Sequence, residues 1–194
     1  MKKTLLAFAL ATGFTTPALA ADAFKFDASH TYIGFAIDHL GFAKTLGEFL
    51  RFDGTLKLDR EDLSRSSIEV SIDTASIDTD QPDFDEHLRS ADFFNVAQHP
   101  AMTFRSTRVE DLGEGRLKVT GDLSLLGTTR PVVLDTRLNR VATHPFRPNI
   151  EVAGFSATTT IDRTAFGMGK YAPAVGTEVE IRIEAEFNRE LAAR

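Results

Sequence analysis

Cysteine is absent from this sequence of 194 residues, and so is tryptophan. Without cysteine the chain can form neither a disulfide nor a thiolate zinc site. It also offers no thiol for lipid attachment behind a leader segment. The fold must therefore be held by buried apolar side chains and hydrogen bonds, with no covalent crosslink.

Basic residues are few relative to acidic ones. The chain has 22 Lys and Arg against 28 Asp and Glu, which gives a net charge of −6. Nucleic-acid binding depends on a basic surface that meets the phosphates. The charge balance therefore argues against a nucleic-acid partner.

Long apolar runs are also missing after the first twenty residues. The sequence opens with MKKTLLAFALATGFTTPALA, where Lys2 and Lys3 precede an apolar stretch and Ala18-Leu19-Ala20 has the small-x-small pattern of a cleavage site. We predict a signal peptide over residues 1–20, cleaved after Ala20, and a single domain over residues 21–194. Cleavage leaves 20 basic residues against 28 acidic ones, a net charge of −8. No later segment approaches the roughly 20 apolar residues of a membrane span, so we expect a periplasmic protein without stable membrane insertion.

Phenylalanine, in contrast, is abundant, with 16 residues against two tyrosines. A phenylalanine side chain buries a large apolar area and carries no polar atom that needs a partner. This composition suits either a thick dry core or an apolar cavity.

Eight segments alternate between apolar and polar residues with the period of a half-buried strand. They are HTYIGFAIDHL, GEFLRFDGTLKL, SIEVSID, AMTFRSTRV, RLKVTGDLSL, PVVLDTRL, EVAGFSATTTIDR and EVEIRIEAEF. One dry and one wet face is typical of antiparallel sheets, and eight such strands bury their dry faces in a sandwich or in a closed barrel. Alternation alone does not separate the two. The length of the strands favours an all-β, eight-stranded antiparallel barrel.

The stretch DFDEHLRSADFF, residues 83–94, has the period of a helix instead. A helical wheel gathers its apolar side chains on one side, which we expect to face the barrel: Phe84, Leu88, Ala91 and Phe94. The acids are expected to face water beside Arg89, with which they form pairs three and four residues apart. Because Asp85 and Glu86 point away from His87, this cluster does not converge as a metal site.

The sequence contains no common catalytic, nucleotide-binding or metal-binding motif. Its five histidines lie far apart with no repeated spacing. We therefore predict no catalytic residue, no cofactor and no metal site. His39 is the notable histidine, because it continues the apolar series of its strand and needs a polar partner or a ligand there.

Four longer segments follow one another along the chain: DASHTYIGFAIDHLGFAKTLGEFLRFDGTLKLD, SIDTASIDTDQPDFDEHLRSADFFNVAQHPAMTFRSTRV, VTGDLSLLGTTRPVVL and GFSATTTIDRTAFGMGKYAPAVGTEVEIRIEAE. In this order they resemble the YceI-like family of bacterial periplasmic polyisoprenoid-binding proteins. The resemblance implies a lipocalin-like barrel of eight strands with a helix between two of them. It also implies an apolar channel that holds a prenyl chain or a similar amphiphile.

The leading hypothesis is that the protein binds, and carries or stores, a long isoprenoid-like lipid such as a polyprenyl phosphate or a quinone. The predicted ligand contacts comprise inward strand positions, a polar contact at His39, and two residues at the openings, Phe42 and Phe166. The full set is Ile33, Phe35, Ile37, His39, Phe42, Phe52, Met102, Phe104, Leu123, Phe155, Phe166 and Ile183.

Two alternatives stay open at the level of sequence. One is a hydrolase or isomerase that acts on a lipid in the same pocket, with His39 or His87 as the acid or base. The other is a solid-cored structural or partner-binding protein without a ligand. The sequence is compatible with a homodimer and does not decide the oligomeric state.

Overall fold

The computed structural model describes residues 21–191, and the predicted signal peptide lies outside the described residues. The strands are β1 (Asp22–Phe26), β2 (Tyr32–His39), β3 (Ala43–Phe49), β4 (Phe52–Leu58), β5 (Ser67–Asp73), β6 (Ile77–Asp78), β7 (Ala101–Asp111), β8 (Arg116–Leu125), β9 (Thr128–His144), β10 (Arg147–Asp162) and β11 (Val175–Glu190). The helices are α1 (Pro82–Arg89) and four short 3-10 helices, η1 (Ala28–His30), η2 (Leu63–Arg65), η3 (Thr74–Ser76) and η4 (Arg163–Phe166). None of the described helices has the length and apolar character that a membrane span requires.

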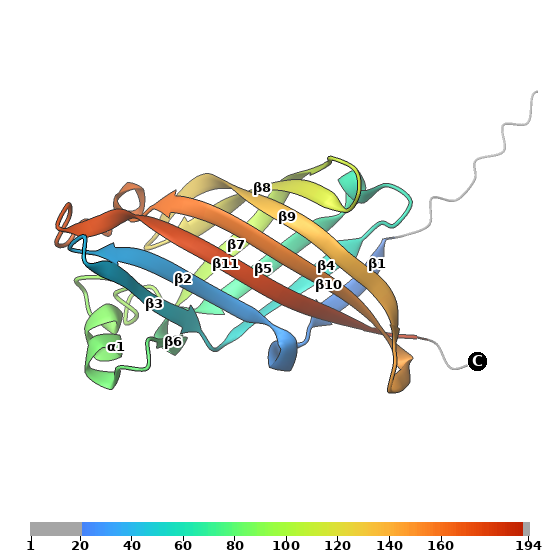
Figure 1. The fold of residues 1–194 in the computed structure, drawn as a ribbon, viewed down its shortest axis with the longest axis horizontal. Coiled ribbons are helices and arrows are strands. Elements are labelled where there is room, and N and C mark those ends of the chain that lie inside the picture. The colour runs from blue at the N-terminus through green and yellow to red at the C-terminus, as the bar shows by residue number, and fades with distance from the viewer. Residues whose placement is uncertain (1–20, 192–194) are drawn as a thin grey trace, which may run out of the picture.

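The strands close into an antiparallel barrel (Figure 1). Around the barrel the order is β1-β4-β5-β7-β8-β9-β10-β11, and β11 pairs back with β1. Three further strands lengthen members of this ring: β2 continues β1 along β11, β3 pairs with β2 ahead of β4, and β6 pairs with β3 beyond β5. Eight long strands, three of them interrupted, therefore form the barrel. The predicted eight-stranded fold is confirmed, and the sandwich alternative is wrong.

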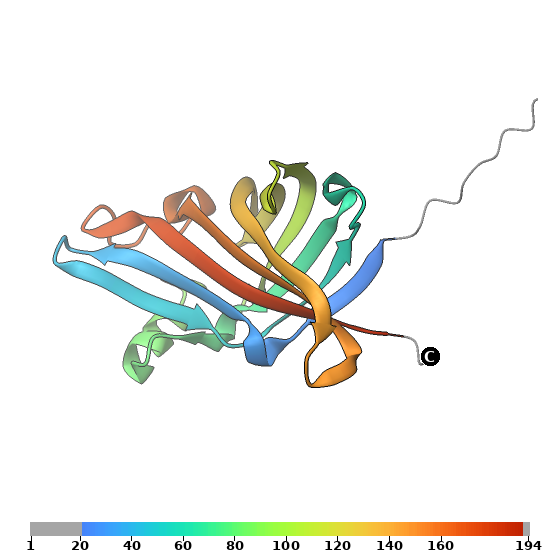
Figure 2. The same cartoon turned by 45° about the vertical axis from the view of Figure 1, so that its right-hand side comes forward.

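The two ends of the barrel differ (Figures 1 and 2). We call the end that carries α1, the β2–β3 turn and the β10–β11 connection the helix end. We call the other end, where β1 begins and β11 ends, the terminal end. The terminal end is filled by a cluster of buried apolar side chains: Phe24, Leu56, Leu58, Ala153, Ala185 and Phe187. Phe26 extends this plug, because its ring lies 4.2 Å from the ring of Phe187.

Helix α1 is shorter than predicted, since it ends at Arg89 and not at Phe94. The backbone N–H of Ser90 donates to the carbonyl of His87, at 3.1 Å, and that of Phe94 donates to the carbonyl of Leu88, at 2.9 Å. These bonds end the helix in a turn that buries Phe93. Ala91, predicted to face the barrel, is exposed instead.

The charges of α1 do not all face water, contrary to the prediction. Asp85 is 6% exposed, and its carboxylate accepts hydrogen bonds from the backbone N–H and the hydroxyl of Thr79, at 2.8 and 2.7 Å. Arg89 donates to the backbone carbonyls of Ala75 and Ile77, at 2.9 and 2.6 Å. A buried carboxylate is stable only when it is hydrogen-bonded, and here the same bonds fasten α1 to η3 and β6.

Replacing Asp85 with alanine should destabilise the protein because it leaves two donors of half-buried Thr79 without their acceptor. We expect the free energy of unfolding to fall by roughly 1–3 kcal/mol. Glu86, which is exposed on the same helix, provides the control, and Glu86→Ala should change stability by less than about 0.5 kcal/mol. Urea denaturation measures both. Equal losses in the two variants would show that Asp85 does not fasten the helix.

Candidate functional site

A cavity of about 580 Å³ lies inside the barrel and reaches from the helix end to the plug at the terminal end. Most of its lining side chains are aliphatic or aromatic and come from the inward positions of the strands. Small side chains contribute to the space, for example Ala157 on β10, which is 7% exposed and faces Ile183 across the β10–β11 pair. A glycine makes room for a larger ring elsewhere: a Cβ on Gly121 would lie 2.4 Å from the ring of Phe104.

Nine of the twelve predicted ligand contacts line this cavity: Ile33, Phe35, Ile37, His39, Met102, Phe104, Leu123, Phe155 and Ile183. Three do not. Phe52 packs edge-on against Phe26, with ring centres 5.4 Å apart. Phe166 was predicted at an opening but is 3% exposed and lies within the core, whereas Phe42 is 87% exposed and does not line the cavity. Contact of the nine residues with a ligand stays a prediction.

The cavity opens at the helix end. Four of its lining residues are exposed, and all four lie at the end of β2 or in the β2–β3 and β10–β11 connections: His39, Leu40, Tyr171 and Ala174. At the terminal end, every lining residue is buried or half-buried. An elongated molecule would therefore enter from the helix end with its leading tip toward the plug.

A network of charges covers the plug at the terminal end. Arg60 donates to both carboxylate oxygens of Glu151, at 2.9 and 2.8 Å, and to Asp22, at 2.8 Å. Arg189 donates to Glu151 at 2.6 Å and also pairs with Asp22. The hydrogen bond to Asp22 is the main reason that the pKa of Arg60 is raised. Two guanidinium groups thus satisfy a carboxylate that is 8% exposed, and they tie β1, β10, β11 and the β4–β5 connection together.

Two histidines lie at the mouth of the cavity, His39 and His87. The ring of His87 lies 5.1 Å from that of Phe93 and 6.1 Å from that of Tyr171, and its Nε2 is 3.9 Å from Asp92. Within residues 21–191, neither imidazole has a hydrogen-bond partner. Both imidazoles can therefore form a hydrogen bond with a polar group of a ligand at the mouth.

Arg163 is a cavity residue that the sequence analysis missed. It is 2% exposed, and its guanidinium donates to the backbone carbonyls of Met168, Gly176 and Val175, at 2.5, 2.8 and 3.0 Å. Burial lowers the pKa of this group. These bonds fold the β10–β11 connection over the helix end. The alternation along β10 could have predicted that Arg163 faces inward, because it continues the odd-numbered inward series that includes Ala157.

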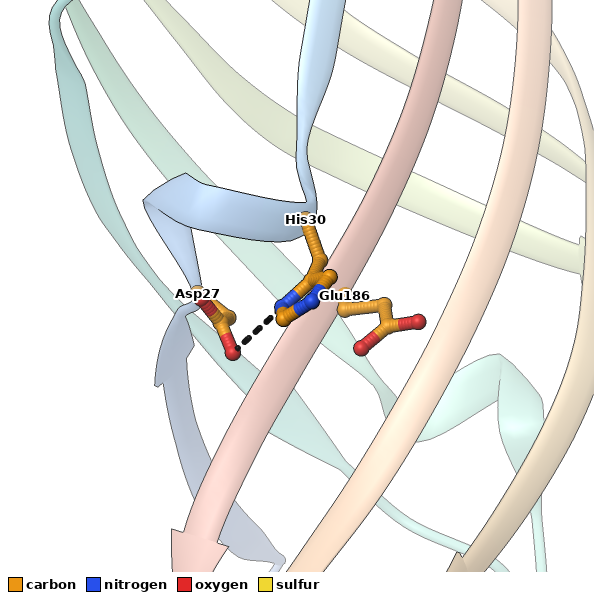
Figure 3. Close-up of side chains that lie close together, drawn as sticks. All are labelled: Asp27, His30 and Glu186. Atoms are coloured by element: carbon orange, nitrogen blue, oxygen red, sulfur yellow. Dashed lines mark hydrogen bonds and ion pairs between the residues drawn. The ribbon is translucent and has the colours of Figure 1, made fainter. Parts of the chain in front are cut away.

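A separate cluster lies on the outside of the barrel, where η1 interrupts the long strand formed by β1 and β2 (Figure 3). Asp27, His30 and Glu186 each present a possible metal-ligand atom within 4.8 Å of the others. The sequence did not predict this cluster, because its histidines show no repeated spacing. The Nδ1 atom of His30 lies 3.1 Å from the Asp27 carboxylate.

The hydrogen bonds of Asp27 favour a structural role for this cluster. Its carboxylate accepts from the backbone N–H and hydroxyl of Ser29, at 3.1 and 2.5 Å, and from the side-chain amide of Asn188, at 2.9 Å. The guanidinium of Arg147 lies 3.7 Å away. A metal ion would have to displace these donors beside a positive charge. We conclude that Asp27 caps η1 and holds the interrupted strand to β11.

The pKa of Asp27 makes this role testable. Burial alone would raise the pKa, but hydrogen bonds from Ser29, His30 and Asn188 outweigh it and hold the pKa far below its usual range. A carboxylate with a depressed folded-state pKa stabilises the fold above its unfolded pKa, about 3.9, and loses this effect as the pH falls toward its folded pKa.

Asp27→Asn should therefore be less stable than the natural protein by an amount that is constant near neutral pH. The difference should shrink progressively below about pH 4. Thermal denaturation of both proteins from neutral pH to about pH 2 measures it. A difference that does not change with pH over this range would show that the pKa of Asp27 is not depressed.

Comparisons with known proteins agree with this fold. The model of the YceI-like domain matches residues 24–187. Protein YceI of Salmonella arizonae is 39% identical over 189 residues, which cover 96% of this chain and 97% of the relative. The barrel is similar to the crystal structure of Burkholderia cenocepacia BcnA, with a TM-score of 0.75 and 22% identity over 83% of this chain and 98% of the other.

A more distant likeness has a TM-score of 0.58 and 14% identity, and covers 84% of this chain and 97% of the other. That structure is a polyisoprenoid binding domain from Saccharophagus degradans implicated in plant cell wall breakdown. At this identity the likeness shows the fold alone. The family model and the Salmonella relative span nearly all of the described residues, and the chain belongs to the YceI-like family.

Proposed function

We propose that the protein binds a long-chain isoprenoid lipid, such as a polyprenyl phosphate or a quinone, and carries or stores it in the periplasm. The observation that carries the proposal is the apolar cavity, closed at the terminal end and open at the helix end. The polyisoprenoid-binding neighbour with the same fold supports this class of ligand. A solid-cored structural role does not account for a space of this size.

The volume of the cavity sets the length of the chain that fits inside it. At roughly 30 Å³ for a group the size of a water molecule, the cavity holds on the order of 20 such groups. That corresponds to about four isoprene units. Burial of roughly 300 Å² of this chain, at about 25 cal/mol per Å², contributes on the order of 7 kcal/mol before ordering costs. Without those costs, this burial would correspond to a dissociation constant on the order of 10 µM.

The polar part of such a lipid would remain at the mouth. Exposed or half-exposed groups able to form hydrogen bonds gather there, namely His39, His87 and Tyr171. Deeper in the cavity the lining offers hydroxyls such as those of Thr136 and Thr159 but few other polar groups. We propose binding without conversion, because neither imidazole at the mouth has a hydrogen-bond partner within residues 21–191 that would fix its orientation.

Protein purified without detergent should release an intact isoprenoid lipid on extraction with organic solvent. Mass spectrometry of the extract identifies the lipid and compares its amount with that of the protein. A hydrolase or isomerase would yield a converted lipid, and conversion would be lost in His39→Ala or His87→Ala. Loading the delipidated protein with a polyprenyl phosphate provides the control for a ligand lost in purification. A protein that neither releases nor takes up lipid would refute the proposal.

Filling the cavity should abolish lipid binding without unfolding the barrel. Ala157→Trp places an indole in the existing space, and we expect the affinity for a fluorescent geranylgeranyl phosphate to fall by a factor of about ten or more, because the indole takes the volume of part of the chain. Thr158→Trp, on the exposed outer face of the same strand, is the matched control and should bind like the natural protein.

The indole itself verifies the design. The chain contains no tryptophan, so the emission of each variant comes from one indole. Blue-shifted emission in Ala157→Trp, and not in Thr158→Trp, places the indole in the dry interior. Unchanged lipid affinity together with such a shift would contradict binding inside the cavity.

A further inference from the structure

The tip of the β2–β3 turn is unusual in two respects: it exposes large apolar side chains, and it has a leucine with a positive φ. Phe42 is 87% exposed and Leu40 is 48% exposed. Leu40 also has a φ of +58°, followed by +74° at Gly41, a turn closed by the N–H of Phe42 donating to the carbonyl of His39 at 3.1 Å. Asparagine, aspartate or glycine is favoured at such a position, and leucine is strained there. Strain and exposure at one apolar turn indicate a function other than folding.

This tip is continuous with the mouth of the cavity. Leu40 is exposed on one side and lines the cavity on the other, and Tyr171, 49% exposed, does the same on the neighbouring connection. The two connections lie next to each other because His39 of β2 pairs with Val175 of β11. In both views of the barrel they project together at the helix end (Figures 1 and 2).

We propose that Leu40, Phe42 and Tyr171 form a docking tip that inserts into the interface of a phospholipid bilayer. The docked mouth would let an isoprenoid chain pass between bilayer and cavity without crossing water. The passage of an isoprenoid chain through the docked mouth rests on the proposed function, whereas docking on the bilayer does not. An apolar chain meets its largest barrier when it is exposed to water, and a docked mouth removes that exposure.

The size and the charge of the tip favour a bilayer over a protein partner. A stable protein interface buries about 800 Å² on each partner, more than three side chains provide. A bilayer, in contrast, deforms around a single aromatic anchor, and tyrosine is enriched at membrane interfaces. The two lysines beside the mouth are paired, Lys44 with Glu180 at 2.5 Å and Lys170 with Asp92 at 3.4 Å, and Asp38 at the turn accepts the N–H of Gly41 at 2.8 Å. Apolar insertion, and not attraction of free basic side chains to an anionic surface, would therefore hold the tip on a bilayer.

Phe146 supplies a control for the docking tip. It is 88% exposed in the β9–β10 turn at the terminal end, far from the mouth. No lining residue of the cavity lies in that turn. A change at Phe146 removes an equally exposed ring and leaves the helix end untouched.

The test measures the binding of the full mature protein to phosphatidylcholine vesicles by co-sedimentation. We expect Phe42→Ser to weaken vesicle binding about tenfold, and Phe146→Ser to leave it unchanged. Because insertion is apolar, binding should persist when the salt concentration is raised. Lipid transfer between two vesicle populations should slow with Phe42→Ser, while binding of detergent-dispersed geranylgeranyl phosphate should not change.

Leu40→Asn separates docking from folding. Asparagine tolerates the positive φ, so this variant should unfold at a higher temperature than the natural protein and yet bind vesicles more weakly. Unchanged vesicle binding in Leu40→Asn and Phe42→Ser would overturn the proposal, and so would an equal loss in Phe146→Ser. A third outcome would also overturn it: the natural protein does not bind vesicles, and Phe42 is needed only for the delivery of lipid to a purified protein acceptor.

The proposed function can fail independently of docking. A protein that releases and takes up no lipid, but binds vesicles through Phe42, would refute lipid carriage and support the docking tip. The reverse, a loaded cavity with vesicle binding that does not depend on Phe42, would refute the docking tip alone.

Discussion

The pairing of β11 with both β1 and β2 is the constraint on which the rest of the structure depends. Val179, Ile181 and Ile183 of this strand lie beside β2, and Phe187 lies beside β1, so one continuous strand closes the barrel along its whole length. Closure by eight tilted strands fixes a diameter at which one layer of side chains just fills the interior or leaves room for one ligand. Here the smaller inward side chains leave room, and the cavity follows from closure and not from a separate pocket-forming segment.

Closure makes a tube, and polar interactions make its two ends different. At the terminal end the carboxylate of Glu151 gathers Arg60 and Arg189 over an apolar plug. At the helix end, Arg163 binds backbone carbonyls and Asp85 binds Thr79, so each orders a connection without filling the interior. An apolar plug covered by charged groups thus closes one end, and charged groups shape the rim of the other. Because α1 is fastened to β6, one side of the rim is fixed. The β2–β3 and β10–β11 connections border the opening.

Much of this arrangement is local enough to be predicted from the sequence. Alternation depends only on neighbouring residues, and it identified the strands, their inward faces and nine residues that line the cavity. It does not say how deep an inward ring lies or which ring it meets, and for this reason it did not reveal that Phe52 and Phe166 pack elsewhere and do not line the cavity. Likewise, a helical wheel separates apolar from charged sides but does not reveal that Thr79 offers donors to Asp85. Contacts between different structural elements, such as those of Asp85 with Thr79 and of Asp27 with Asn188, decided the roles that were missed, whereas Arg163 continues the inward series of β10 and could have been found.

The unfilled interior has an energetic consequence that argues for an occupant. Engineered cavities lower the stability of a protein by about 24 cal/mol for each Å³ left empty. By this measure, an empty space of about 580 Å³ costs on the order of 10 kcal/mol of packing energy. This is comparable to the whole stability of a typical domain. A solid core was chemically within reach, because larger apolar side chains at positions such as Ala157 would occupy the space. Retaining the space leaves packing energy available to a ligand, and a ligand that occupies the barrel at a hundred times its dissociation constant returns about 2.7 kcal/mol of it as stability.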